Sequence, residues 1–412
     1  WRAGAGDVPR RPVSGPAMAR HGGPFFTLLA LAGARDPDVG KSTEELVRQH
    51  GYPVERHQVL TADGYLLTAF RIPHGRAQAT ARGPVLLQHA LLCSSFEWVN
   101  NAPQQSLGFL LADEGFDVWL GNNRGNAYGL NHTSLPVDSE AFWDFSWDEM
   151  ALHDLPASVE YILRVTGAPS LSYVGHSEGT IQAFAGFSRN AELSAKVDLF
   201  VALAPVAYVY HQTSPVFSAF AELGVDGLFQ RLGQREFLPV DSLLNRISPR
   251  LCSWLPEGCD AAIFLFCGAT RHINTTRLPV YLARTPAGTS VKNMAHWAQQ
   301  VRHDGFRMYD YGSERKNRER YNRSSPPRYE LGRVTVKTAL FTGGHDILAD
   351  PTDVGRLVAA LPPGTVVHQQ QTEGYAHLDF AWGQDANTIV YARAIELLKA
   401  HSRQPAREAL IV

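Results

Sequence analysis

Apolar and polar positions alternate along several short segments of this chain, and helical spacing appears between them. Residues 57–73, HQVLTADGYLLTAFRIP, form two strand-like runs around Asp63-Gly64, which predicts a hairpin. Residues 83–92, GPVLLQHALL, form a continuous apolar run that is typical of a strand buried on both faces. Further strands are expected within residues 117–125, 171–176, 196–206, 334–346 and 365–377.

Helical patterns separate these strands. Residues 106–116 have helical spacing, and residues 142–167 predict one long amphipathic helix that ends near Gly167. Strands that alternate with helices predict an α/β fold with a mostly parallel, doubly wound sheet. The alternation stops between about residues 208 and 330, where we expect an inserted, mainly helical cap or lid. Residues 35–207 and 331–412 would then form the core.

The first 34 residues have the pattern of a targeting segment. Met18-Ala-Arg-His is a short basic region, FFTLLALAGA follows as an apolar stretch, and Ala32-Gly-Ala34 is a small-residue cleavage site. We therefore predict a leader and secretory signal peptide over residues 1–34. The alternative is a disordered extension followed by a buried helix. Because the apolar stretch is about half the length of a membrane span, we expect no integral membrane segment.

The charge balance excludes some classes of partner. The chain has 412 residues, 38 Lys and Arg against 40 Asp and Glu, and a formal net charge of −2. Such a balance leaves no basic excess for nucleic acid or for an anionic membrane. The aromatic-rich cap would suit a lipid substrate, although its aromatic residues fit equally well as the core of the cap itself.

The four cysteines are too few for a disulfide scaffold. Cys252 and Cys259 lie close together in the sequence and are the natural pair for one bridge in an oxidising compartment. Cys93 and Cys267 each lie in an apolar run and are expected to be buried thiols. The spacing of the four cysteines does not suit a zinc-binding site.

Three glycosylation sequons agree with export. They begin at Asn131, Asn274 and Asn322. We therefore expect a secreted protein, with the lysosome as the alternative location.

Ser177 is the candidate nucleophile. It stands in LSYVGHSEGTIQAF, between a short apolar strand and the start of a helix, with Gly175 and Gly179 on either side. This G-x-S-x-G pattern is typical of the strained turn that raises a serine above the sheet of an α/β hydrolase. A serine hydroxyl also needs an imidazole to take its proton and a carboxylate to orient that imidazole.

Asp346 is the candidate acid. It ends the strand-like segment ALFTGGHD, where a carboxylate would lie at the carboxyl edge of the sheet. Asp350 and Asp353 lie further along, in ILADPTDV, and are interpreted as turn and helix N-cap residues.

His377 is the candidate base. It lies in GYAHLDF, in the loop between the last predicted strand and the terminal helix. His345 adjoins the acid and His368 lies inside a strand, so neither suits this role. The order Ser, Asp, His is the one expected for a hydrolase of this sheet type.

Two backbone N–H groups are expected to stabilise the oxyanion. One belongs to Glu178, directly after the nucleophile, and the other to Leu91, in the loop after the strand at residues 83–92. Since this chemistry needs only protons and water, we expect no metal and no organic cofactor.

With these residues in view, the chain resembles the acid lipase family, which includes gastric and lysosomal acid lipases and related insect lipases. The resemblance runs from about Asp36 to the terminal helix, through segments such as LADEGFDVWLGNNRGN, YVGHSEGT, NTTRLPVYLARTPAGTSVKNMAHW and GGHDILADPTDV. It implies the α/β-hydrolase fold, a cap with a disulfide near Cys252 and Cys259, and hydrolysis of triacylglycerol or cholesteryl ester. It also implies the same triad and oxyanion residues.

Two positions depart from the family pattern. Glu178 stands where the family usually has Gln, and Ala90 stands where it usually has Gly. We hypothesise that a charged Glu178 opposes the forming oxyanion and so shifts the rate optimum towards acid pH. The additional Cβ of Ala90 would alter acyl-chain or leaving-group preference.

Two other functions compete with a lipase. A carboxylesterase for shorter soluble esters would use the same fold and triad. A catalytically silent lipid-binding protein would keep the fold alone, although the ordered Ser, Asp and His disfavour it.

Overall fold

The computed structural model describes residues 36–77, 82–222, 233, 235–240 and 242–403. The predicted leader and signal peptide, residues 1–34, lie outside the described residues.

A mixed β-sheet forms the centre, with strand order β1-β2-β4-β3-β6-β7-β10-β11, and β5 pairs with β2 at one side. Strands β1, β4 and β5 each pair with β2 in an antiparallel manner. From β4 onward, each strand in the order β4-β3-β6-β7-β10-β11 is parallel to its neighbours. Their bounds are β1 Glu55–Leu60, β2 Tyr65–Ile72, β3 Pro84–Gln88, β4 Asp117–Leu120, β5 Asn131–His132, β6 Leu171–His176, β7 Val197–Leu203, β10 Thr338–Gly343 and β11 Val366–Thr372. The predicted hairpin and mostly parallel sheet are thus present.

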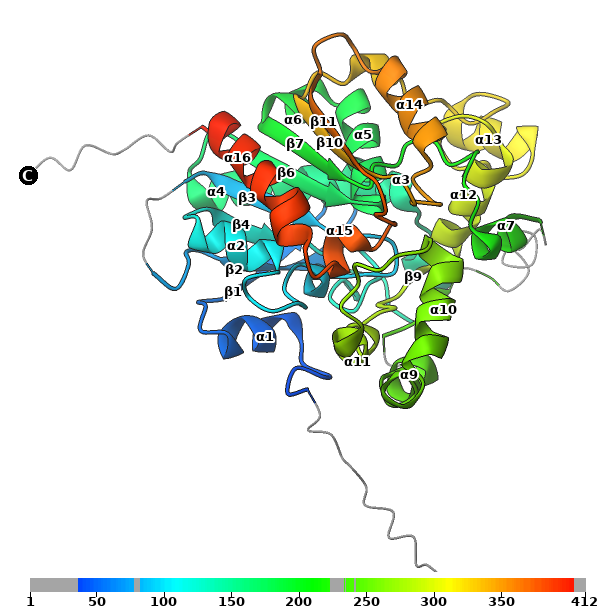
Figure 1. The fold of residues 1–412 in the computed structure, drawn as a ribbon. Helices are drawn as coiled ribbons and strands as arrows, with labels where there is room; N and C mark the ends of the chain where they lie inside the picture. Colours follow the sequence, from blue (N-terminus) through cyan, green and yellow to red (C-terminus); the bar gives the residue numbers. More distant parts are fainter. Residues whose placement is uncertain (1–35, 78–81, 223–232, 234, 241, 404–412) are drawn as a thin grey trace, which may run out of the picture. The chain divides into compact units, whose positions relative to one another are not determined.

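Helices cover both faces of the sheet. In Figure 1, α16 crosses in front of it, and α4 and α5 lie behind. The helices of the core are α1 Thr43–Gln49, α2 Leu107–Asp113, α3 Trp147–Glu149, α4 Leu155–Thr166, α5 Glu178–Arg189, α6 Ala191–Ala195, α14 Pro351–Ala360, α15 Asp379–Trp382 and α16 Ala392–His401. Short 3-10 or π turns are η1 Ser95–Trp98, η2 Glu140–Trp143, η3 Met150–Asp154, η5 Leu331–Arg333 and η6 Asn387–Tyr391.

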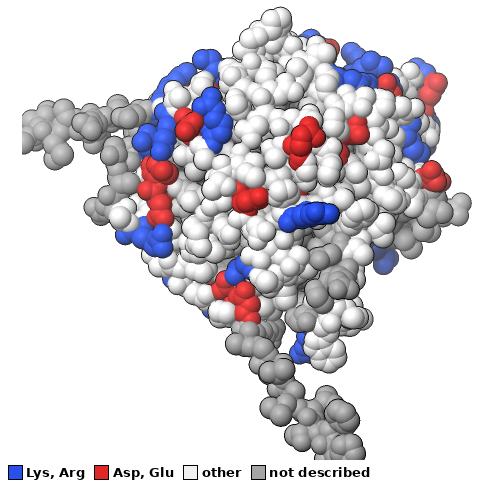
Figure 2. All heavy atoms as spheres, in the orientation of Figure 1, with Lys and Arg blue, Asp and Glu red and all other residues white. Residues whose placement is uncertain are grey.

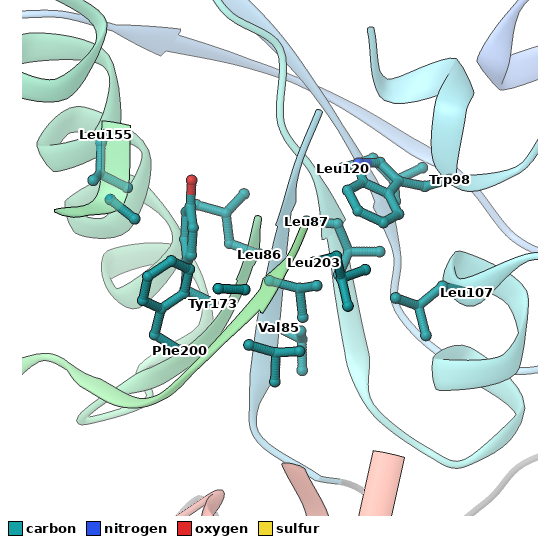
Figure 3. Close-up of a cluster of buried hydrophobic side chains, with 14 of the residues drawn as sticks. Val85, Leu86, Leu87, Trp98, Leu107, Leu120, Leu155, Tyr173, Phe200 and Leu203 are labelled. Carbon is teal, nitrogen blue, oxygen red and sulfur yellow. The ribbon is translucent and has the colours of Figure 1, made fainter. Parts of the chain in front are cut away.

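The core lies between the sheet and these helices. Consecutive residues of a strand point to opposite faces, so Leu86 packs with Tyr173 and Phe200 on the side of α4 and α5, whereas Leu87 lies on the other side (Figure 3). All five residues of β3 are buried. This is the double-sided burial that its continuous apolar run predicts.

The segment between β7 and β10 is mainly helical and lies beside the sheet in Figure 1. It contains α7 Pro215–Glu222, β8 Glu236–Phe237, α9 Leu243–Trp254, α10 Pro256–Cys267, η4 Thr275–Arg277, α11 Leu278–Leu282, β9 Thr289–Ser290, α12 Val291–Arg302 and α13 Glu314–Tyr321. A disulfide joins Cys252 in α9 to Cys259 in α10. The boundaries of a cap at residues 208–330 stay a prediction.

The long helix predicted over residues 142–167 is wrong at its start. Phe142 and Trp143 lie in the separate turn η2, and the helical segment begins at Trp147. Ser146 is the N-cap of this segment: its hydroxyl accepts the N–H of Asp148, and the side chain of Glu149 accepts the N–H of Ser146, which together form a capping box. The helical segment ends as expected, at Gly167 with a φ of 67°.

Two smaller expectations also need correction. Asp350 is the N-cap of α14, but Asp353 lies within the first turn of the helix and accepts bonds from the backbone N–H and Nδ1 of His211, both at 2.8 Å. Cys93 is a buried free thiol as predicted, whereas Cys267 is only partly buried.

The surface agrees with the balanced charge of the chain. On the face shown in Figure 2, Lys and Arg are mixed with Asp and Glu, and large areas carry no charge. Asn131 and Asn322 are exposed, and Asn274 is partly buried. None of the described helices combines the length and the apolar character that crossing a bilayer requires.

Candidate active site

Ser177 occupies a strained turn between β6 and α5. Its backbone has φ 51° and ψ −113°, which is an unfavourable conformation for any residue other than glycine. A Cβ at Gly175 would lie 2.8 Å from the backbone of Gly179, and a Cβ at Gly179 would lie 2.4 Å from the carbonyl oxygen of Gln88. The two flanking glycines are therefore required by close backbone packing.

The site lies at the point where the sheet changes its direction of winding. From β3 the chain proceeds to β4 on one side and then to β6 on the other. Crevices at the carboxyl ends of such strands are the usual ligand sites of α/β sheets. Ser177 follows β6, and Leu91 lies in the loop after β3.

The structure brings Ser177, His377 and Asp346 together. His377 Nε2 lies 2.7 Å from Ser177 Oγ, and His377 Nδ1 lies 2.9 Å from Asp346 Oδ2. Because a carboxylate accepts, Nδ1 carries the proton, which leaves the lone pair of Nε2 facing the serine hydroxyl. The arrangement is suited to removing the proton from Ser177.

Backbone contacts hold the acid and the base in place. Asp346 Oδ1 accepts the N–H groups of Leu348 and Ala349 at 2.9 and 2.8 Å. The N–H of His377 donates to the carbonyl of Cys267, at the end of α10, at 3.2 Å. His345 is exposed and His368 lies within β11, so neither takes part.

The two expected oxyanion donors lie beside Ser177. Glu178 N begins α5, and Leu91 lines the cavity that Ser177 enters. Within the described part of the chain, neither N–H donates to a protein acceptor. Both are therefore free to bind a substrate oxygen.

The side chain of Glu178 is turned towards α12. Its Oε1 accepts Asn293 Nδ2 at 2.7 Å and Trp297 Nε1 at 2.9 Å. Burial raises the pKa of this carboxyl to about 7, although both donors lower it. Much of this carboxyl is therefore uncharged at neutral pH and nearly all of it is uncharged in acid.

A cavity of about 590 Å³ opens at Ser177 and His377. Its other lining residues are almost all apolar and come from the core and from the segment between β7 and β10, including Leu91, Val206, Val209, Phe217, Phe220, Leu251, Phe266, Met294, Trp297 and Trp382. The volume and apolar lining are suited to a long apolar substrate. Among the described residues, no three His, Cys, Asp or Glu side chains lie close enough together to hold a metal ion.

Two buried residues near the site were not singled out from the sequence. Glu97, in η1, bonds to His176 Nδ1 and to the N–H of Ala90, and His176 directly precedes Ser177. The signal available in the sequence was a lone acidic residue within the apolar segment SFEWV. Its partner 79 residues away could not be read from that signal.

The chain is similar to known lipases. Residues 83–384 match the family described as "alpha/beta hydrolase fold", and residues 43–102 match the "Partial alpha/beta-hydrolase lipase region". Human lysosomal acid lipase/cholesteryl ester hydrolase is 44% identical over 89% of this chain and 93% of its own, and human gastric triacylglycerol lipase is 41% identical over 88% and 92%. Lipase lipl-1 of Caenorhabditis elegans is 42% identical over 88% and 93%.

Solved structures share the fold at low sequence identity. The α/β hydrolase GrgF from Penicillium sp. sh18 has a TM-score of 0.51 and 14% identity, over 85% of this chain and 99% of that chain.

Proposed function

This chain belongs to the acid lipase family of α/β hydrolases, and from that premise we propose that it hydrolyses the carboxylic ester bonds of neutral lipids. Triacylglycerol is the proposed substrate, with cholesteryl ester as an alternative. Both agree with the names of the relatives and with an apolar cavity of about 590 Å³.

The observation that carries this function is the 2.7 Å contact between Ser177 Oγ and His377 Nε2, two residues that line that cavity. In the proposed reaction His377 takes the proton of Ser177 as Oγ attacks the ester carbonyl, and Asp346 stabilises the imidazolium. The N–H groups of Leu91 and Glu178 bind the oxyanion. His377 then protonates the leaving alcohol, and water activated by His377 releases the fatty acid from Ser177.

We further propose that residues 208–330 act as a cap that meets the lipid surface. Exposed apolar side chains gather on α9, on α10 and at the residue between them: Leu243, Leu244, Ile247, Leu251, Trp254, Leu255, Phe264, Leu265 and Phe266. Four of them, Leu244, Leu251, Leu255 and Phe266, also line the cavity, so the exposed apolar surface continues into the site. Such a patch favours contact with an oil or membrane surface.

Export to a secreted or lysosomal location agrees with the relatives, and we assign secretion as the destination. The Cys252–Cys259 disulfide suits an oxidising compartment. Expression of the full chain in cultured cells, followed by activity measurements in the medium and in a lysosomal fraction, distinguishes the two. Recovery in lysosomes alone would reverse the assignment.

The experiment that tests the activity measures fatty acid released from emulsified trioleoylglycerol between pH 4 and 9. We expect release by the native protein and none by Ser177→Ala. Ser172→Ala is a matched control, because Ser172 is a buried serine of β6 whose hydroxyl has no partner among the described residues. Cleavage of short soluble esters alone would favour a carboxylesterase. A protein that cleaves nothing and is not labelled by a fluorophosphonate would be a lipid-binding protein.

A further inference from the structure

Glu97 and His176 form a buried pair directly behind the proposed triad. Their side chains are 1% and 0% exposed. One carboxylate oxygen of Glu97 contacts His176 Nδ1, and the other accepts the N–H of Ala90 at 2.8 Å. His176 Nε2 contacts the carbonyl oxygen of His377 at 3.0 Å. The pair therefore touches the main chain of both the oxyanion loop and the base.

The contacts determine the protons on His176. A backbone carbonyl only accepts, so Nε2 must donate to His377, and Nδ1 donates to the carboxylate. Burial opposes the charged form, but the negative charge and the hydrogen bond of Glu97 raise the pKa of His176 above its usual value. Glu97 therefore favours the protonated form of His176.

Ala90 is held on both sides of its backbone. Glu97 accepts its N–H, and its carbonyl oxygen accepts His89 Nδ1 at 2.8 Å and the N–H of Cys93 at 3.1 Å. Fixing the backbone of Ala90 limits rotation of the peptide that carries the N–H of Leu91. An oxyanion donor is effective only when it points at the oxyanion before the reaction begins.

We propose that Glu97 and His176 are positioning residues that align the oxyanion donor Leu91 and the base His377 with Ser177 as one unit. The proposal rests on the function proposed above and adds two residues to it. Neither residue touches the reacting atoms. Glu97 acts through the backbone of Ala90, which precedes the oxyanion donor Leu91, and His176 acts through the backbone of His377.

Two substitutions of Glu97 separate alignment from charge. Glu97→Leu leaves the Ala90 N–H and His176 Nδ1 without a partner. Glu97→Gln can satisfy both, because its carbonyl accepts the Ala90 N–H and its amide donates to the lone pair of a neutral His176, whose Nε2 still donates to His377. If alignment of these backbone groups matters, Glu97→Gln should recover the kcat that Glu97→Leu loses.

The assay is hydrolysis of p-nitrophenyl butyrate, with rates expressed per site that reacts with a fluorophosphonate. We expect Glu97→Leu to lower kcat about 100-fold, the effect of losing one oxyanion donor, and to change KM by less than about threefold. Glu97→Gln should restore kcat to within about tenfold of the native value. A Leu variant with native kcat and a lowered Tm would show that the pair only stabilises the fold and would overturn the proposal.

Asp148 supplies the matched control. It is also a buried carboxylate, and it accepts one backbone N–H, from Tyr309 at 2.8 Å, and one side-chain donor, Tyr329 Oη at 2.6 Å. Asp148→Leu should lower Tm and keep kcat within about threefold. An equal loss of kcat in both Leu variants would mean that any buried unpaired donor disables the enzyme, which also overturns the proposal.

His176→Asn keeps the test decisive if Glu97→Leu does not fold. Asn can donate to Glu97 but is too short to reach the carbonyl of His377, so we expect kcat to fall about tenfold or more. Native kcat in this variant would refute the role of His176. The native protein and Ser177→Ala are measured alongside on both p-nitrophenyl butyrate and emulsified trioleoylglycerol. Equal, negligible rates of these two on both substrates would refute the proposed function itself, whereas an active native protein with unaffected variants refutes only the positioning role.

Discussion

Glu178 is expected to make the folded protein less stable as the pH rises from about 4.5 to 7. Its carboxyl has a pKa of about 7 in the folded protein, against an ordinary value of 4.5, because it is buried. Between these values the folded chain retains a proton that the unfolded chain loses. The stability that the protonated carboxyl contributes is therefore fully present below pH 4.5, and it is lost as the pH rises through 7.

The size of the effect follows from the two pKa values. One pKa unit corresponds to about 1.4 kcal/mol, so ionisation of Glu178 costs the folded state about 3 kcal/mol by pH 8. Glu178→Gln keeps an oxygen that accepts Asn293 and Trp297 but does not titrate. Relative to the native protein, the Gln variant should gain about 3 kcal/mol between pH 4.5 and 8, or about 4 °C in Tm for a domain of this length.

Urea denaturation at pH 4.5 and 8 measures this difference. Glu192→Gln is the control, because Glu192 is an exposed glutamate in the first turn of α6. A free energy of unfolding that changes with pH equally in the native and Glu178→Gln proteins would refute the reasoning.

The same variant also tests the rate hypothesis. If the charge of Glu178 opposes the oxyanion, Glu178→Gln retains activity above pH 7 that the native protein loses. An unchanged pH-rate profile would rule out this role.

Three further changes test other parts of the site. Asp346→Asn should lower kcat about 10⁴-fold, because an amide can donate to His377 Nδ1 and so favours the tautomer whose proton is on Nε2, which cannot accept from Ser177. Burst and steady-state kinetics measure the loss, and a loss below tenfold would contradict the assigned role. Trp254→Ser should weaken adsorption to emulsified trioleoylglycerol about tenfold, since this 83% exposed side chain is expected to enter the oil, and it should leave hydrolysis of soluble butyrate esters unchanged. Replacing Cys252 and Cys259 together by Ala should destabilise the α9–α10 hairpin by about 2 kcal/mol, seen as faster proteolysis within it; equal proteolysis would mean that the bridge adds no stability.

The sequence predicted the parts of the fold that follow from local pattern. The apolar run of β3 and the Gly175-x-Ser177-x-Gly179 turn each carry a physical requirement that can be read from neighbouring residues. Asp346 and His377 could be placed because each follows a strand, and parallel strands end at the same edge of the sheet. The structure brings both to Ser177.

Other features depend on contacts between distant segments and left little trace in the sequence. The bond from His176 to the backbone of His377 spans 201 residues, and Glu178 reaches Asn293 across 115. Asp353 was interpreted as a helix cap, since its actual partner, His211, lies 142 residues away and leaves no signal in the neighbouring sequence. At Trp147 the local capping box, and not the apolar periodicity, determined where the helical segment begins.

The 200 residues that separate Ser177 from His377 have a consequence during synthesis. A ribosome that adds roughly 5 to 20 residues per second needs about 10 to 40 s to travel from one to the other. Throughout that interval the nascent chain carries the proposed nucleophile without its proposed base. If the proposed chemistry holds, lipolysis begins only after synthesis has reached His377 and the last β-strand before it, β11, has been made.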